Sequence, residues 1–242
     1  MIIAVLSDIH GNIIALWSVL NKIFANKKIE GIVICGDLID YGPNSNEVIR
    51  ELHHINIPII CNIWGNHEHA IMENMYDRFS SIRGQNSARY TKQQLTGEAL
   101  SYIENEMSKD GKAEFFINRK KCLAVHGSLR DSYWFSIHPD SDLEGYQEFD
   151  FVFSGHSHEP HCFEKYYQVE NANTRNRKKT IFINPGSVGQ PRNLNNRAQY
   201  AVVDTETEEV GLLKVAYDID KQMRMFSDKV DVFYKNRIKL GV

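Results

Sequence analysis

The chain has little excess of charge of one sign: over 242 residues its formal net charge is −3. This net charge gives no strongly basic overall field that would attract the phosphate backbone of nucleic acid, so bulk nucleic acid is disfavoured. We expect no bulk nucleic acid as a partner, although a nucleotide-sized substrate is compatible with this charge. Cysteine is also scarce, with four residues at positions 35, 61, 122 and 162 and no C-x-x-C pair. The first three lie within apolar runs, which predicts buried free thiols in a reducing compartment.

Long apolar runs are missing as well. No run approaches the ~20 apolar residues that a membrane span requires, and the apolar stretch of residues 1–6 is too short for the core of a signal peptide. We therefore expect a cytoplasmic protein without membrane contact. The apolar fraction of 42% and the twelve phenylalanines suffice for the core of one α/β domain over residues 1–242. Composition gives no oligomeric state.

Three strand–loop–helix units begin the chain. Such a repeated order of elements is typical of a parallel sheet with right-handed crossovers. Short apolar runs predict strands at residues 2–6, 31–35 and 57–61, and apolar residues at helical spacing predict helices at 16–24, 47–53 and 67–76.

The second half of the chain is richer in strands and follows a polar region, residues 85–107, that is predicted to be helical. The polar and basic residues 171–179 are interpreted as the solvated tip of a hairpin. Candidate strands lie at residues 114–118, 122–125, 149–154, 161–167, 179–183, 200–203 and 210–217, and residues 218–226 are predicted to form a closing helix.

Polar residues directly follow five of the predicted strands. Open α/β sheets place their ligand crevices beyond the carboxyl ends of their strands. Carboxylate, amide and imidazole groups together bind divalent cations. The pattern therefore predicts one site for two metal ions, assembled by the fold from distant parts of the chain. The segments are Asp8-Ile9-His10, Gly36-Asp37, Gly65-Asn66-His67-Glu68, His126-Gly127 and Gly155-His156-Ser157-His158.

The order of these motifs resembles that of the calcineurin-like metallophosphoesterase superfamily, from residue 2 to about residue 204. The segments Gly36–Pro43 (GDLIDYGP) and Asn184–Arg192 (NPGSVGQPR) are similar to those of its small prokaryotic phosphodiesterases. The resemblance implies an α/β fold: a four-layer α/β/β/α sandwich of two mixed sheets, with the metals at its rim. The implied ligands are Asp8, His10, Asp37 and His158 for one ion, and Asp37, Asn66, His126 and His156 for the other.

The resemblance further implies hydrolysis of a phosphate ester through a hydroxide that bridges two metal ions. His67 would act as the general acid on the leaving alkoxide, and Asp40 would orient His67 and hold its proton. A small phosphodiester is the expected substrate, with nucleotide-like compounds among the candidates. We expect two divalent ions, manganese first, with nickel, cobalt, iron, zinc or magnesium as alternatives, because ligand type alone does not identify a native metal.

Other functions would use the same residues. Hydrolysis of phosphomonoesters, dinucleoside polyphosphates or phosphoproteins would need the same metals, and the sequence does not separate these substrates from diesters. A non-catalytic scaffold of the same fold is a further alternative. The complete set of seven ligands, together with His67, argues against that scaffold.

Several residues near the motifs have two interpretations. Glu68 is interpreted as an acidic residue in the first turn of a helix rather than as a residue of the site. The aromatic residues of segment 128–147 either pack a long loop, which is favoured, or form a wall of the substrate pocket. Arg192 and Arg197 either contact phosphate or belong to a rigid turn. Trp64 is expected at the rim of the pocket.

Overall fold

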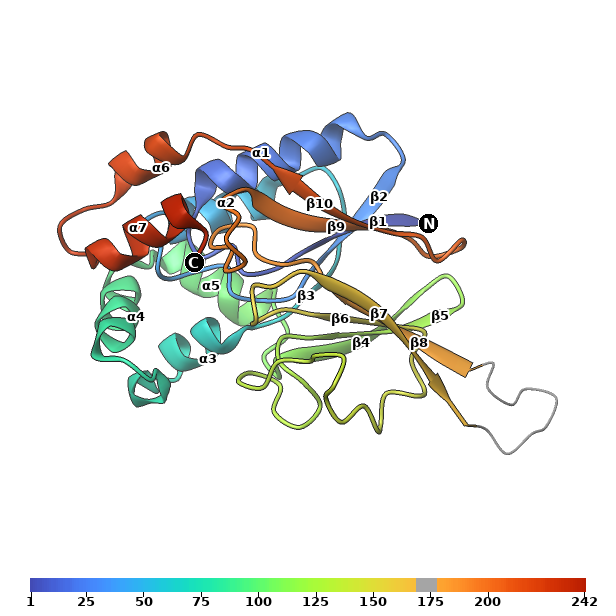
Figure 1. Cartoon of the computed structure of the whole chain (residues 1–242). Helices are drawn as coiled ribbons and strands as arrows, with labels where there is room; N and C mark the ends of the chain where they lie inside the picture. Colours follow the sequence, from blue (N-terminus) through green and yellow to red (C-terminus); the bar gives the residue numbers. More distant parts are fainter. Residues whose placement is uncertain (169–177) are drawn as a thin grey trace.

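The computed structural model describes residues 1–168 and 178–242, and its main feature is two five-stranded sheets that lie face to face (Figure 1). The first sheet consists of β1 (Ile2–Leu6), β2 (Ile29–Ile34), β3 (Ile59–Asn62), β9 (Ala198–Asp204) and β10 (Val210–Val215). Its strand order is β10-β9-β1-β2-β3. The strands β1, β2 and β3 are parallel, and β9 pairs antiparallel with both β1 and β10.

The second sheet has the strand order β4-β5-β6-β8-β7. Its three central strands, β5, β6 and β8, are parallel, and the two edge strands pair antiparallel with their neighbours. All three central strands therefore direct their carboxyl ends to the same side of the sheet. The strands are β4 (Lys112–Ile117), β5 (Lys120–Val125), β6 (Phe151–Ser154), β7 (His161–Tyr167) and β8 (Lys178–Asn184).

An apolar core lies between the two sheets. Because alternate residues of a strand point to opposite faces, Ile3 and Val5 of β1 pack in one buried cluster with Phe153 of β6. Their neighbour Leu6 instead belongs to the cluster that packs under the helices. Strand β1 is thus buried on both faces, which explains why it is a continuous apolar run.

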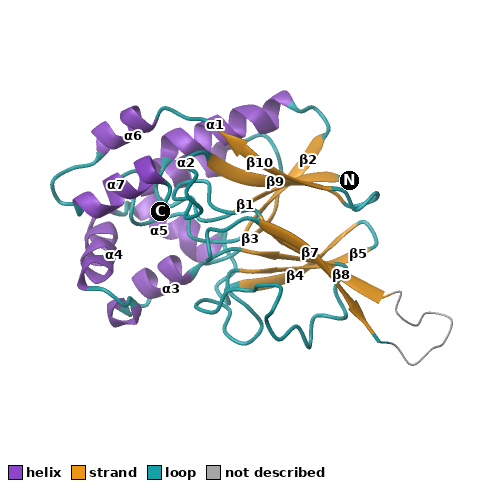
Figure 2. Ribbon diagram, in the orientation of Figure 1, coloured by secondary structure: helices purple, strands orange, loops and turns teal. Residues whose placement is uncertain are grey.

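Helices cover the outer face of the first sheet (Figure 2). No helix of the described residues is both long and apolar enough to cross a membrane. The helices are α1 (Ile13–Ala25), α2 (Ser45–His54), α3 (Asn66–Met72), α4 (Ile82–Gln94), α5 (Gly97–Asn105), α6 (Ile219–Met225) and α7 (Val232–Leu240), with a 3-10 turn at Tyr76–Arg78.

The outer face of the second sheet is covered by the loop segment 127–149, in which no helix is present (Figure 2). Tyr146 and Phe149 of this segment are buried against Val125 and Phe182 of the sheet. The fourth layer of the sandwich is therefore formed by apolar side chains of an irregular segment.

The predicted α/β architecture with two mixed sheets is confirmed, including the parallel pairing of β1, β2 and β3. The bounds of β1 and β7 are those predicted. The polar region 85–107 contains most of α4 and all of α5. The prediction missed α7, since only Tyr234 and Ile238 of this helix are buried and its apolar stripe is weak. The predicted hairpin tip lies almost entirely outside the described residues.

Candidate metal centre

The loops that follow five strands bring all seven predicted ligands into one cluster. Asp8 and His10 follow β1, Asp37 follows β2, and Asn66 begins α3 after β3. From the second sheet, His126 follows β5, and His156 and His158 follow β6. The cluster forms because the carboxyl ends of the parallel strands in both sheets meet at the same side of the molecule.

Gly155 lies where the loops of the two sheets meet. A Cβ atom at this position would lie 2.1 Å from the hydroxyl oxygen of Ser7 and 3.2 Å from a carboxylate oxygen of Asp8. Only glycine permits this approach without a shift of the backbone. The glycine beside His156 therefore allows the second sheet to present its histidines to the carboxylates of the first.

One group of ligand atoms comes from Asp8, His10, Asp37 and His158, and these atoms lie within 4.8 Å of one another. The Nε2 atoms of His10 and His158 are 3.2 Å apart. Each ring has its Nδ1 at a main-chain carbonyl, 3.2 Å for His10 and 2.6 Å for His158. If Nδ1 carries the proton, two Nε2 lone pairs face each other, and a cation between them removes the repulsion.

A second group comes from Asp37, His126 and His156, again within 4.8 Å. The Oδ1 atom of Asn66 lies 3.0 Å from Nε2 of His126 and 2.9 Å from Nδ1 of His156. Asp37 belongs to both groups: its Oδ2 atom is 3.6 Å from Nε2 of His10 and 3.3 Å from Nε2 of His126. This carboxylate therefore links the two groups of potential ligand atoms.

Burial sets the charge of these groups. Both carboxylate oxygens of Asp8 are buried without a hydrogen-bond partner, and burial raises the pKa of Asp8 to about 7. Burial also lowers the pKa of His156 to about 3 and holds those of His10 and His158 well below their usual range. Burial also disfavours the charged form of His126, but the neighbouring Asp37 raises the pKa of His126 to about 9. Three neutral imidazoles and an unsatisfied carboxylate are ligands that suit divalent cations, so these residues fit such ions.

The ligand loops hold strained backbone conformations. A left-handed residue other than glycine costs roughly 1–2 kcal/mol. Main-chain hydrogen bonds fix the loops: the amide of Asp8 donates to Gly36 at 3.0 Å, and that of His10 donates to Asp37 at 2.9 Å. The φ angles are 54° for Asp8, 48° for His10, 55° for Asp37, 70° for Asp40, 66° for His156 and 59° for His158.

Glu68 organises the loop that carries Asp37. It lies in the first turn of α3, as predicted, but it is fully buried and accepts four main-chain hydrogen bonds. The donors are the amides of Asp37, Leu38, Ile39 and Gly65, at 2.7 to 3.2 Å. The interpretation as a helix-end acid alone was therefore incomplete, because the contact between α3 and the loop after β2 depends on tertiary structure.

His67 and Asp40 form a buried pair beside the cluster. Nδ1 of His67 lies 2.8 Å from Oδ2 of Asp40. The Oδ1 atom of Asp40 accepts hydrogen bonds from Ser87 at 2.6 Å and from Thr91 at 2.8 Å. Burial alone would lower the pKa of His67, but Asp37 and Asp40 raise it. Sequence reasoning missed Ser87 and Thr91, although their spacing of four residues in a polar helix is a usable signal.

A cavity of about 240 Å³ opens over the cluster. Its lining includes His67, Phe79 and Trp134, and two arginines, Arg78 and Arg192, contribute positive charge. The guanidinium carbon of Arg78 lies 5.2 Å from the ring centre of Trp134. The cavity therefore combines metal-ligand groups with cationic and aromatic walls, an arrangement that suits a small phosphorylated molecule.

Other predicted rim residues lie elsewhere. Trp64 is buried in the core under the helices, where its indole N–H donates to Ile103 at 2.7 Å, so the rim prediction was wrong. Apolar packing against α5 determines its position. Arg197 is exposed and does not line the cavity. From segment 128–147, Trp134 lines the cavity, whereas Tyr146 packs in the core as the simpler interpretation expected.

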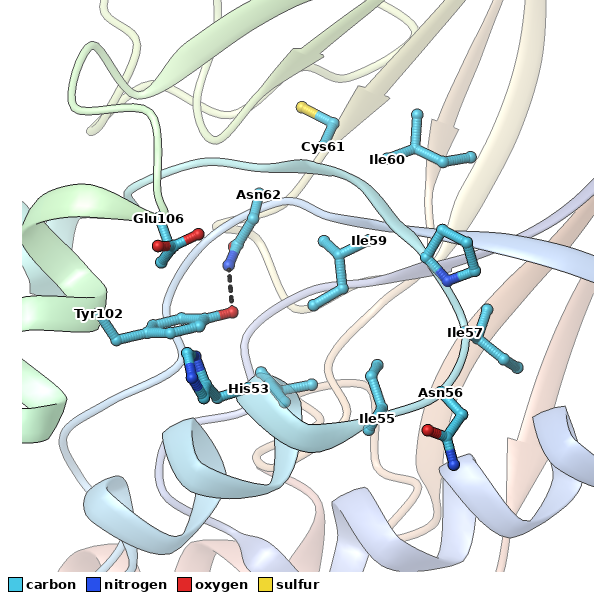
Figure 3. Close-up of a pocket in the computed structure, with 12 residues that line it drawn as sticks. His53, Ile55, Asn56, Ile57, Ile59, Ile60, Cys61, Asn62, Tyr102 and Glu106 are labelled. Atoms are coloured by element: carbon cyan, nitrogen blue, oxygen red, sulfur yellow. Dashed lines mark hydrogen bonds between the residues drawn. The ribbon is translucent and has the colours of Figure 1, made fainter.

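A larger cavity of about 520 Å³ lies away from the cluster, between the end of α2, β3 and α5 (Figure 3). Four isoleucines contribute to its walls, and Asn62 donates a hydrogen bond to the hydroxyl of Tyr102 at 3.1 Å (Figure 3). Glu106 contributes its one carboxylate. Metal-ligating groups do not converge there, so the smaller cavity is the candidate site.

Comparison with known proteins agrees with this geometry. A family model described as the calcineurin-like phosphoesterase superfamily domain matches residues 1–208. The chain is 31% identical over 245 residues to the uncharacterized protein MJ0912 of Methanocaldococcus jannaschii, with 99% of this chain and 98% of that protein covered.

Solved structures show the same fold. A metallophosphoesterase from Sphaerobacter thermophilus is 25% identical, with a TM-score of 0.73 and complete coverage of both chains. The hypothetical protein PH1004 from Pyrococcus horikoshii is 22% identical, with a TM-score of 0.73 and coverage of 96% of this chain and 97% of the other.

Proposed function

Because the chain belongs to the calcineurin-like phosphoesterase superfamily and is a metal-dependent phosphoesterase, we propose that it hydrolyses a small phosphodiester. One observation carries the proposal. Side chains from five separate loops converge with the His67–Asp40 pair at the base of a single cavity. The motifs Gly36–Pro43 and Asn184–Arg192 favour a diester as the first substrate class.

The proposed cofactor is a pair of divalent ions, with manganese first. Asp37 belongs to both ligand groups and would bridge the ions. When bound, the ions would supply a water of lowered pKa and offset negative charge on the phosphoryl oxygens. The proposed ligands are Asp8, His10, Asp37 and His158 for one ion, and Asp37, Asn66, His126 and His156 for the other.

His67 is the proposed general acid. Its ring lines the cavity, and Asp40 holds Nδ1, so Nε2 is left to donate a proton to the oxygen of the leaving group. Asp40 is a positioning residue: Ser87 and Thr91 fix the carboxylate, and the carboxylate fixes the imidazole. A phosphodiester whose leaving group is a poor alkoxide gains most from such a proton.

The cavity limits the substrate. A volume of about 240 Å³ suits a phosphoryl group with a small substituent better than a phosphorylated protein. Trp134 offers an aromatic surface for a planar group such as a nucleobase. Phosphomonoesters and dinucleoside polyphosphates would use the same groups and are the alternative substrates.

Reconstitution tests this function. The purified protein is loaded in turn with manganese, nickel, cobalt, iron, zinc or magnesium, and bound metal is counted by elemental analysis. We expect two ions per chain and a higher kcat/KM for bis(p-nitrophenyl) phosphate than for p-nitrophenyl phosphate. A higher value for the monoester would favour the phosphomonoesterase alternative. Two bound ions without hydrolysis of any phosphate ester would refute the proposal.

We also propose that the chain forms one domain and works in the cytoplasm. The two sheets share a single interior, and the four cysteines are free thiols, three of them buried as predicted. Free thiols persist in a reducing compartment. Fractionation of cells that express the protein checks this location.

A further inference from the structure

Tyr41 connects the metal-ligand cluster to the carboxyl-terminal helix α7. Its ring centre lies 4.8 Å from that of His10 and 4.3 Å from that of Tyr234, with the two tyrosine rings stacked at 19°. Tyr41 also lines the cavity, and Tyr234 is buried. Helix α7 is therefore packed directly against a wall of the candidate site.

Three arginines from three separate elements lie around Tyr41 and α7. Arg192 lines the cavity together with Tyr41, and Arg83 and Arg237 contact Phe233 of α7. Arg83 lies in the first turn of α4, Arg192 follows β8, and Arg237 lies in α7. The guanidinium carbons of Arg83 and Arg237 lie 4.0 and 5.1 Å from the ring centre of Phe233. Arg192 lines the cavity, and after burial it is the main cause that lowers the pKa of Arg237 to about 10.

These positive charges are not neutralised by acidic side chains. Within residues 1–168 and 178–242, no carboxylate side chain forms an ion pair with Arg83, Arg192 or Arg237, whereas Arg78 has Asp131 at 3.9 Å. The Nε atom of Arg192 is buried without a hydrogen-bond partner. The Nε atom of Arg237 donates to the main-chain oxygen of Val242. The two terminal nitrogens of Arg237 are therefore left to contact an anion.

The surroundings add to the positive potential. Arg83 stands at the amino-terminal end of α4, the positive end of the helix dipole, and the first turn of this helix contains no acidic residue. Contact with the face of Phe233 limits the conformations of both guanidinium groups. In the part of the chain that the structure describes, none of the three guanidinium groups has an acidic side chain as its partner, and Arg237 has only the main-chain oxygen of Val242. The groups repel one another, and an anion with several oxygens would offset that repulsion.

We propose that Arg83, Arg192 and Arg237 form a second anion site that binds a second phosphoryl group of the substrate. This inference rests on the proposed function, because the first phosphoryl group would lie over the metal ligands. Tyr41 lies between His10 of the ligand cluster and Tyr234 of α7, and therefore between the two proposed positions. The preferred substrate is then a phosphodiester that carries a further phosphate on the same molecule.

A matched pair of substrates tests this proposal. Both are p-nitrophenyl esters of thymidine 5′-phosphate, one with a free 3′-hydroxyl and one with a 3′-phosphate. For the metal-loaded protein we expect the 3′-phosphate to raise kcat/KM about tenfold or more, mainly through KM. In the double variant Arg83→Gln, Arg237→Gln the ratio between the two esters should fall to about one. Arg119→Gln, in the exposed turn between β4 and β5, is the control and should keep the ratio.

Two results would overturn the second site: equal kcat/KM values of the wild type for the two esters, or an unchanged ratio in the double variant. If the metal-loaded protein hydrolyses neither ester, the proposed function fails instead. In that case, titration calorimetry on the metal-loaded protein tests the second site by measuring the affinities of two nucleotides. Thymidine 3′,5′-bisphosphate should bind about tenfold more tightly than thymidine 5′-phosphate in the wild type and equally tightly in the double variant. Equal affinities in the wild type would refute the second site.

Discussion

His67 and Asp40 are joined by a contact of 2.8 Å between Nδ1 and Oδ2, and two hydroxyl groups of α4 hold the other oxygen of the same carboxylate. The carboxylate therefore has little freedom to rotate, and the imidazole is fixed in the orientation that directs Nε2 into the cavity. The proposed proton donor is therefore oriented before any substrate arrives.

Replacement of His67 tests the proton donor. We expect His67→Ala to lower kcat by roughly 10²–10⁴-fold for a diester with an alkyl leaving group, because the alkoxide would leave unprotonated. The loss should be much smaller with p-nitrophenolate, which leaves readily without a proton. Elemental analysis should still find two ions. Equal losses with both leaving groups would contradict the assignment.

Replacement of Asp40 tests the positioning role. Asp40→Asn keeps the size of the side chain but removes the charge that favours protonated His67, and we expect kcat to fall by about 10–100-fold for the alkyl diester. KM and metal content should change little. The double variant with His67→Ala should lose no more activity than His67→Ala alone, since both residues act through one proton. Additive losses would show that Asp40 acts independently of His67.

Asp37 and Asp8 differ in the number of ions that each would hold. Asp37 belongs to both ligand groups, and Asp8 belongs to one. We therefore expect Asp37→Ala to lose both ions and Asp8→Ala to lose one, as counted by elemental analysis after gel filtration. Two ions retained by Asp37→Ala would disprove the bridging role.

Glu68 should contribute strongly to the stability of the metal-free protein. Glu68→Ala leaves four buried main-chain donors without an acceptor, and we expect a loss of roughly 3 kcal/mol in the free energy of unfolding. Urea denaturation measures it. The matched control is Glu73→Ala at the exposed end of the same helix, which should change stability by less than about 0.5 kcal/mol.

Metal binding should stabilise the fold. The buried oxygens of Asp8 have no hydrogen-bond partner, and the facing Nε2 atoms of His10 and His158 repel each other when both rings are protonated at Nδ1. A cation would relieve both. A metal present at about 100 times its Kd should add about 2.7 kcal/mol, which raises Tm by roughly 5–10 °C for a chain of this size. Differential scanning calorimetry with manganese and with a chelator measures the difference. An unchanged Tm would contradict the existence of the site.

The sequence predicted the site best where a local pattern and a strand end coincide. Asp8, Asp37 and His126 each follow an apolar run, so their place beyond a parallel strand, and hence their meeting, could be derived from the pattern alone. Ser87 donates its hydrogen bond to Asp40, which lies 47 positions earlier in the chain. A local sequence pattern cannot indicate a contact over such a separation. The same holds for Tyr234, whose position depends on stacking with Tyr41 rather than on its own helix.

At the left-handed positions of the ligand loops, the residue that would favour stability differs from the residue that would favour activity. Glycine would relieve backbone strain at Asp8, His10, Asp37, His156 and His158. It would also remove the carboxylate or imidazole that we propose as a metal ligand. A search for more thermostable variants would therefore be drawn toward inactive proteins at these positions. Related proteins that retain Asp or His at all five positions, although glycine fits this backbone better, are therefore expected to be under selection for catalytic activity.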